Sequence, residues 1–441
     1  MKYLPVSERL MMRFPFGVIF GCLLLIVLIF FPLAHHEIKL SLFGVAAFLV
    51  LARSIVLEGR IGLAREVWFW FMWYVICGSF YALYGAVERN PGAFFSLAIY
   101  LVWPVVYVGL VAGAALDDRF IRWLLRTCVV GLFLVSALGV MAVLGGIGWI
   151  SADYVPLLSQ DQAVVLFPGL SRMRYRPISS LFFLLPFVAT SLMAPRSCWD
   201  QVASRGLRWL ALLLGTFVVF ASGRRALMLV AVVGPLLGFL LLFTSTGVSR
   251  RAFFQVLLAI IGGICLLIAL PPISLQGIWQ WFWGGFNPAQ DTSAAIRGAQ
   301  GDFLTKAWLS APYLGHGLGS VAPVVRSSAR PWQYELQYHL LLFQTGLVGV
   351  ACYSAGILWM IGKAYKISAA DPGPGAFLIP TIAGLAGVLI GNASNPYLQA
   401  YGALWMVFLP LAIINHWCLH VRGPKRPSGC IMARESPLIV S

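Results

Sequence analysis

The stretch LRWLALLLGTFVVFASGRRALMLVAVVGPLLGFLLLFTST, residues 207–246, indicates the kind of fold that this chain adopts. It contains two apolar runs, 207–221 and 225–246, joined at Ser222-Gly223-Arg224-Arg225. A helix needs about 20 mainly apolar residues to cross a bilayer. The stretch therefore predicts two consecutive membrane helices with a short, positively charged turn between them.

The whole chain repeats this pattern of apolar runs and short connections. Of its 441 residues, 60% are hydrophobic and 10% are charged, and the mean hydropathy is +0.87. Soluble domains do not have this composition, and a large soluble catalytic domain is excluded because the spans use most of the chain. We predict an all-α polytopic membrane protein with about 12 transmembrane helices and one long periplasmic loop. The predicted spans are 14–34, 38–57, 67–87, 94–116, 123–148, 177–195, 207–221, 225–246, 252–271, 337–361, 376–393 and 399–419.

The positive charges predict the orientation of these helices. The chain has 31 Lys and Arg against 15 Asp and Glu, a net charge of +16. With the N-terminus in the cytoplasm, 20 of the 31 fall in cytoplasmic segments, as the positive-inside rule requires. We expect both termini in the cytoplasm, and a retained first helix because no small-residue cleavage site follows the first run. Since the charges flank the spans, they do not point to a nucleic-acid partner.

The predicted spans divide the chain into five segments. They are membrane helices 1–5 with the first outer loop (1–175), membrane helices 6–9 with outward-facing arginines (176–271), the long periplasmic loop (272–336), membrane helices 10–12 (337–419) and a basic cytoplasmic tail (420–441). The spans contain almost no ionisable residues at mid-depth, which disfavours an ion-coupled transporter.

Several arginines lie on the outer side, against the positive-inside rule. They are Arg172, Arg174 and Arg176 before the sixth span, Arg224 and Arg225 before the eighth, and Arg297 in the long loop. Arg176-Pro177 and Ser222-Gly223-Arg224-Arg225 each precede a helix start, and Ser222 is suited to cap its helix. Free backbone N–H groups, the helix dipole and a guanidinium together favour an anion such as a diphosphate. The alternative is anchoring to lipid headgroups.

The long loop carries two further candidate features. The first is Gly315-His316-Gly317-Leu318-Gly319, whose glycines let backbone approach a ligand or form a tight turn. The second is Glu335 with His339, four residues apart and therefore expected on one helix face. Once water is excluded, a carboxylate at the membrane boundary is suited to act as a general base. For His339, the alternative is a polar residue facing a loop.

These motifs, in this order, resemble the O-antigen polymerase and O-antigen ligase superfamily. The matching set is Ser222-Gly223-Arg224-Arg225-Ala226-Leu227, then Arg297, then Pro312-Tyr313-Leu314-Gly315-His316-Gly317-Leu318-Gly319, and then Gly346-Leu347-Val348-Gly349. The likeness covers roughly residues 170–410; the earlier spans match only as generic membrane helices.

The resemblance implies a GT-C-like, metal-independent, inverting glycosyltransferase in the bacterial inner membrane, with a periplasmic active site. The donor would be an oligosaccharide on undecaprenyl diphosphate, and no cofactor is implied. Partners would be that lipid-linked oligosaccharide, membrane lipid, and a chain-length regulator and flippase of the same pathway. Residues implied to bind the diphosphate are Arg176, Arg224, Arg225 and Arg297. Residues implied to contact the glycan or shape the loop are Arg172, Arg174, Gly315, His316, Gly317, Gly319 and Tyr338.

The catalytic position separates the two branches of the superfamily. Ligases have a histidine eleven residues before the first glycine of the Gly-x-x-Gly pair, and the matching position here is Glu335. A glutamate there resembles the polymerase branch, so we expect Glu335 as the catalytic base, with His339 one turn further on as the alternative. A ligase that transfers the glycan to lipid A core or protein, a lipid-linked oligosaccharide flippase, and an assembly scaffold are the other hypotheses.

Overall fold

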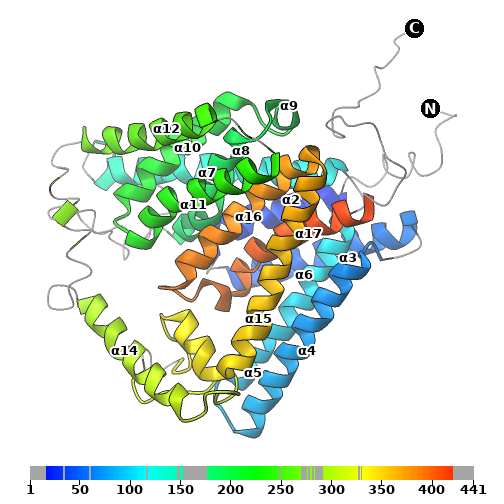
Figure 1. Ribbon diagram of the computed structural model, residues 1–441, viewed down its shortest axis with the longest axis vertical. Coiled ribbons are helices and arrows are strands. Elements are labelled where there is room, and N and C mark those ends of the chain that lie inside the picture. Colours follow the sequence, from blue (N-terminus) through cyan, green and yellow to red (C-terminus); the bar gives the residue numbers. More distant parts are fainter. Residues whose placement is uncertain are drawn as a thin grey trace.

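The computed structural model describes residues 16–32, 35–58, 61–115, 118–146, 149–151, 176–246, 248, 250–269, 276, 279–280, 283, 292–325, 328 and 330–420. These residues form helices and connecting segments and contain no strand (Figure 1). The elements are α2 (Phe16–Phe30), α3 (His36–Glu58), α4 (Arg65–Val87), α5 (Ala93–Leu97), η1 (Ala98–Val102), α6 (Trp103–Ala114), α7 (Asp118–Gly146), η3 (Arg176–Ser180), α8 (Leu181–Met193), α9 (Arg196–Trp199), α10 (Arg205–Ala221), α11 (Arg225–Thr246), α12 (Arg250–Ile268), α14 (Thr292–Leu309), α15 (Gln337–Ala370), α16 (Pro372–Asn392), η4 (Tyr397–Gln399), η5 (Tyr401–Ala403) and α17 (Trp405–His420). The all-α prediction is confirmed for this part of the chain.

Many of these helices are suited to a bilayer. Among the described residues, seven helical segments are long and apolar enough to cross a membrane. They are Arg65–Val87, Ala93–Ala114, Asp118–Gly145, Arg225–Thr246, Arg250–Ile268, Gln337–Ala370 and Pro372–Asn392. Each of the twelve predicted spans contains a helix, but α2, α8, α10 and α17 are shorter than 18 residues, and α3 is not among the seven. The protein is therefore a multi-pass membrane protein, and the count of twelve crossings remains a prediction.

The centre of the protein is built around α8. All thirteen residues of α8 are buried, which is typical of a helix surrounded by protein on every side. Glycines let its neighbours approach closely: a Cβ at Gly387 of α16 would collide with the Phe182 carbonyl oxygen, and one at Gly238 of α11 would collide with Thr190 Oγ1. Helices in membranes gain their contacts through small residues of this kind. The sixth predicted span is thus the core of the fold.

The helix α15 is interrupted near its start. Gly346 has φ +60° and ψ −169° inside the helix, and the N–H groups of Leu347 and Val348 donate to the carbonyls of Pro312 (3.0 Å) and Tyr313 (3.1 Å). The predicted span over 337–361 lies within α15, but the helix is kinked at Gly346 and continues to Ala370. The break is stable because carbonyls from the long loop replace the missing helical acceptors.

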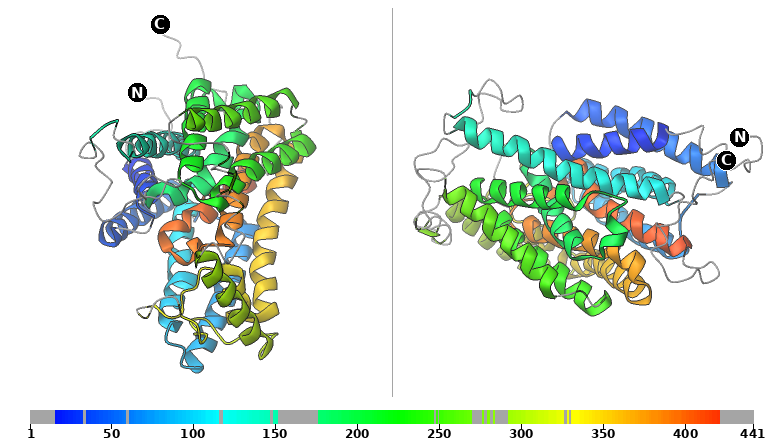
Figure 2. Two further views of the ribbon diagram at one scale, coloured as in Figure 1. Left: turned by 90° about the vertical axis from the view of Figure 1, so that its left-hand side faces the viewer. Right: turned by 90° about the horizontal axis from the view of Figure 1, so that it is seen from above.

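The helix α4 connects two opposite ends of the molecule. At its start, the N–H of Ala64 donates to Asn415 Oδ1 of α17 (2.8 Å). Near its other end, the Tyr81 carbonyl accepts from the N–H of Leu318 in the long loop (3.1 Å). Figures 1 and 2 show α5 and α14 together at this second end. We call it the outer end, and the end with Asn415 the inner end. The helix α4 has 23 residues and is therefore about 35 Å long.

Candidate active site

Two predicted site residues form an ion pair at the outer end. Arg297 Nε of α14 lies 3.3 Å from Glu335 Oε2, and the two side chains are 32% and 20% exposed. Glu335 lies on irregular backbone two residues before α15, whereas His339 lies in the first turn of that helix and is exposed. The prediction that Glu335 and His339 share a helix face is therefore wrong, because the helix begins only at Gln337.

Buried neighbours fix the backbone of Glu335. Tyr334 is fully buried, and its hydroxyl accepts from the Ala322 N–H (2.7 Å) and donates to the Ala322 carbonyl (3.1 Å). The N–H of Glu335 itself donates to Oε1 of the buried Gln300 (3.5 Å). Gln300 and Arg297 are one turn apart on α14. The same helix therefore holds both the backbone and the carboxylate of Glu335.

A second arginine emerges from the turn before α11. Gly223 has φ +65°, a conformation that favours glycine and that reverses the chain between α10 and α11. The Ser222 hydroxyl accepts from the N–H of Arg224 (3.2 Å), the residue before α11. Ser222 is the C-cap residue of α10, so this bond lies within the turn and is not the predicted cap of the following helix. Arg224 Nη1 donates to the hydroxyl of Tyr397 in η4 (3.3 Å). The sequence motif thus builds a turn that directs Arg224 toward η4.

Tyr397 connects the two charged groups. Burial raises its pKa, the Arg224 guanidinium lowers it, and the Glu335 carboxylate raises it. The charge of Glu335 is therefore felt at the hydroxyl that Arg224 contacts. The ring of Tyr397 also lies 5.1 Å from that of Phe182, the second residue of α8. Arg224 and the start of α8 therefore both contact Tyr397, whose pKa also responds to Glu335. This tyrosine was not predicted as a site residue, although it directly follows the outer turn Asn395-Pro396.

The structure describes only some of the other predicted arginines. Arg225 is the first residue of α11 and is half-buried. Arg176 begins η3, directly before α8, and its backbone alone is described. Arg172 and Arg174 lie outside the described residues. Their predicted roles remain predictions.

The glycines of the long loop pack tightly against backbone. Gly315, Gly317 and Gly319 have φ of +68°, +80° and +79°. A Cβ at Gly317 would lie 2.6 Å from Gly85 Cα of α4, and the Gly319 carbonyl accepts from the N–H of Gly92 (3.1 Å). This segment attaches the long loop to the outer end of α4, so its glycines have a structural role whether or not they also approach a ligand.

Two more predicted residues stabilise the same region. His316 Nε2 lies 2.9 Å from the Ala307 carbonyl and 3.2 Å from Ser310 Oγ, at the carboxyl end of α14. The Tyr338 hydroxyl donates to the Leu389 carbonyl of α16 (2.6 Å), and the side chain is 43% exposed. His316 therefore completes the end of α14, and Tyr338 joins α15 to α16 close to Glu335.

Positive charge that was not predicted as part of the site lies at the outer start of α3. Lys39 is fully buried, donates to the Pro32 carbonyl (3.1 Å) and lies 4.8 Å from the ring centroid of Tyr401. Burial lowers the pKa of His36, and the charges of Lys39 and Arg330 lower it further. The outer end thus gathers cations from α3, the long loop and the turn before α11.

An apolar cavity of 490 Å³ adjoins the site. Gln337 and Tyr338, which directly follow the segment of Glu335, form part of its wall. Most of the remaining wall is aromatic or aliphatic and comes from α4, α15 and α17, including Trp70, Tyr353 and Phe408. A charged group and an apolar chamber therefore lie next to each other, as the binding of an amphiphile requires.

These features define a multi-pass α-helical membrane protein with a charged site at one end. No protein-family model matches the chain, and no curated protein matches it. Function is therefore inferred from the motifs and from the geometry around Glu335.

Proposed function

We propose that the protein is a polysaccharide polymerase of the O-antigen polymerase and ligase superfamily. It would transfer oligosaccharide repeat units from undecaprenyl diphosphate onto another lipid-linked glycan, at the periplasmic face of the inner membrane. The observation that carries this proposal is the Arg297–Glu335 pair together with the Arg224–Tyr397 contact, whose tyrosine responds to the charge of Glu335. These residues provide cations that would bind a diphosphate and a carboxylate that would accept a proton from a sugar hydroxyl.

The arginines would bind the leaving diphosphate. Arg224 projects from the glycine turn that precedes α11, and Arg225 is the first residue of that helix. Guanidinium groups bind phosphate oxygens in two-point geometry and are positively charged at every physiological pH. They would stabilise the charge that develops as the bond between the anomeric carbon and the diphosphate oxygen breaks.

Glu335 would act as the base in the same step. Its carboxylate would accept the proton of the acceptor hydroxyl as that oxygen forms a bond to the anomeric carbon from the face opposite the diphosphate. The configuration at this carbon would invert, and undecaprenyl diphosphate would leave. A carboxylate that is only 20% exposed is suited to this role, because little water competes for it.

Arg297 would link substrate binding to activation of the base. In its present position the guanidinium neutralises Glu335 at 3.3 Å. A diphosphate with its higher negative charge would compete for Arg297 and release the carboxylate. The base would then be free when the donor is in place.

The apolar cavity would accept part of the lipid chain. Its wall begins at Gln337, two residues after Glu335, and is mainly aromatic and aliphatic. A volume of 490 Å³ holds a section of a polyprenyl chain and leaves the rest to the bilayer. The orientation that the positive-inside rule predicts would place this site on the periplasmic side.

A deletion strain tests this proposal whatever sugars the repeat unit contains. It is complemented with wild type, with Glu335→Gln or with Glu88→Gln, an exposed glutamate at the same end, and its surface glycans and lipid-linked glycans are separated by size. We expect wild type and Glu88→Gln to restore a ladder of long glycans, and Glu335→Gln to leave single repeat units. Long glycan that stays on its lipid diphosphate in the deletion strain would refute the polymerase and indicate a ligase with His339 as the base.

A further inference from the structure

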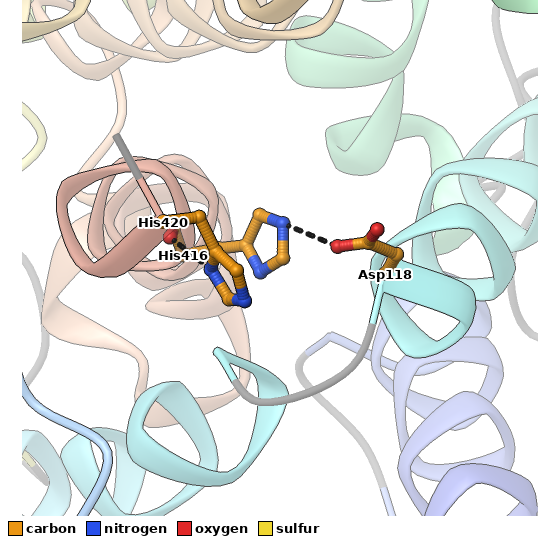
Figure 3. Close-up of side chains that lie close together, drawn as sticks. All are labelled: Asp118, His416 and His420. Carbon is orange, nitrogen blue, oxygen red and sulfur yellow. Dashed lines mark hydrogen bonds and ion pairs between the residues drawn. The ribbon is translucent and has the colours of Figure 1, made fainter. Parts of the chain in front are cut away.

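A group of metal-binding side chains lies at the inner end, far from the proposed active site. Asp118, His416 and His420 each offer one ligand atom, and these atoms all lie within 4.8 Å of one another (Figure 3). Within the part of the chain that the structure describes, this is the one group of three His, Cys, Asp or Glu with such spacing. Asp118 is the first residue of α7, and the histidines are one turn apart at the end of α17.

The hydrogen bonds of the two histidines orient them as metal ligands. His416 Nδ1 lies 2.8 Å from the Ala115 carbonyl, and His420 Nδ1 lies 2.8 Å from the His416 carbonyl. A carbonyl at Nδ1 selects the tautomer in which Nδ1 carries the proton and Nε2 the lone pair. Metal-binding histidines are commonly held in this way. Each Nε2 is therefore available to a cation.

The surroundings of His416 favour a positive charge at this side chain. This side chain is fully buried, and its Nε2 lies 2.9 Å from Asp118 Oδ1 while its Nδ1 faces the Ala115 carbonyl. A neutral imidazole has a single N–H and cannot donate to two oxygens at once. A metal ion bound by both His416 Nε2 and the carboxylate would compensate this arrangement of two oxygens around one imidazole.

We propose that Asp118, His416 and His420 bind a Zn²⁺ ion. Two imidazole nitrogens and a carboxylate oxygen are a ligand set that zinc favours, with water in the fourth position. Bonds of about 2.1 Å in a tetrahedral arrangement bring ligand atoms to about 3.4 Å from one another. The exposed His420 side chain is free to approach the ion, and the Asp118 carboxylate, now 2.9 Å from His416 Nε2, would move outward by about 0.5 Å to reach this spacing.

The ion would fasten α7 to α17. Its neighbourhood is already rigid: Asn415 Nδ2 donates to the carbonyl of Gly62 (2.7 Å). The nearby Arg122, whose charge acts on Asp118, is itself held by Gln201 Oε1 at 2.7 Å. A metal bound only in the folded state would stabilise the protein in proportion to its occupancy.

Zinc titration of the full-length chain tests this proposal. The protein is purified in detergent through a tag without histidine, and Zn²⁺ binding is measured by calorimetry for wild type, Asp118→Asn, His420→Ala and His339→Ala. We expect one Zn²⁺ per chain, binding at least tenfold weaker in Asp118→Asn and His420→Ala, and wild-type affinity in His339→Ala. Unchanged affinity in His420→Ala, or no binding by wild type, would overturn the proposal in favour of a protonated His416.

Two further measurements distinguish the loss of a zinc ligand from the loss of the folded structure. His420 is exposed, so metal-free His420→Ala should melt at the same temperature as metal-free wild type. Zn²⁺ should raise the melting temperature of wild type but not that of His420→Ala. His420→Cys replaces one zinc ligand by another and should restore binding. Failure of this rescue in a variant with a wild-type melting temperature would contradict direct ligation by residue 420.

Discussion

The outer and inner ends of this protein each contain a group of titratable side chains, but on different kinds of backbone. At the outer end, Glu335, Arg224 and Tyr397 lie in a bend, a glycine turn and a short 3-10 helix. At the inner end, His416 and His420 lie on regular α17 and Asp118 on the first turn of α7. Irregular segments allow charged groups to rearrange around a substrate, whereas helix ends hold ligands at fixed spacing. The outer end is therefore suited to catalysis and the inner end to a structural ion.

After substitution of Glu335 itself, Arg224→Ala should cause the largest loss in the rate of glycan elongation. Removing one preorganised donor from developing charge costs about 2.7–4 kcal/mol, a rate loss of roughly 10²–10³. The measurement is the rate of glycan elongation by purified protein. Lys306→Ala, which removes an exposed cation of the same end, should retain the wild-type rate. Wild-type activity of the Arg224→Ala variant would mean that this turn is not part of the active site.

The glycines of the long loop offer a matched test of structure. Gly317→Ala places a Cβ 2.6 Å from Gly85 Cα at φ +80°, so we expect a loss of about 2–4 kcal/mol in stability. Gly298→Ala on α14 meets nothing within 4 Å and should be neutral or raise stability by up to about 1 kcal/mol. Thermal unfolding in detergent measures both. Equal melting temperatures would mean that the loop does not attach to α4 as described.

Removing the hydroxyl of Tyr397 should have a smaller effect than removing Arg224. Tyr397→Phe keeps the ring against Phe182 and leaves one Nη1–H of Arg224 without its hydroxyl acceptor. A hydrogen bond to a charged group contributes about 1.5–3 kcal/mol, so the elongation rate should fall by roughly 10- to 150-fold. A loss as large as that of Arg224→Ala would instead give Tyr397 a direct role in catalysis.

Chelation should affect the proposed zinc site at the inner end and leave catalysis at the outer end almost unchanged. EDTA should lower the melting temperature of zinc-loaded wild type, because it removes the ion from Asp118, His416 and His420. It should leave the initial elongation rate unchanged, because arginines supply the positive charge at the outer end. Activity that is lost with EDTA and restored by a divalent ion would contradict metal-independent transfer.

The sequence predicts the helices well because a bilayer imposes one strong requirement. Apolar runs of span length must become helices, and each predicted run contains one. The Ser222–Arg225 turn was also predictable, since glycine and serine have local conformational preferences. The break at Gly346 was not, because it depends on the carbonyls of Pro312 and Tyr313, which approach it from the loop.

The candidate site residues were predictable only where residue type and position in the sequence were sufficient to identify them. Arg224, Arg297 and Glu335 were found as charged residues on the outer side. The pairing of Arg297 with Glu335 and of Arg224 with Tyr397 depends on helix packing, which hydropathy does not encode. The inner cluster was missed although His416 and His420 have the four-residue spacing of a ligand pair, because the third ligand, Asp118, comes from a distant helix.

The most direct test of the central claim is elongation by the purified protein. Lipid-linked repeat units extracted from the deletion strain are incubated with wild type or Glu335→Gln, and glycan length and released undecaprenyl diphosphate are measured by mass spectrometry. We predict that wild type forms multimers on the lipid and releases one lipid diphosphate per added unit, while Glu335→Gln still binds the lipid-linked units but forms no multimers. Elongation by Glu335→Gln at the wild-type rate would contradict the assignment of Glu335 as the base.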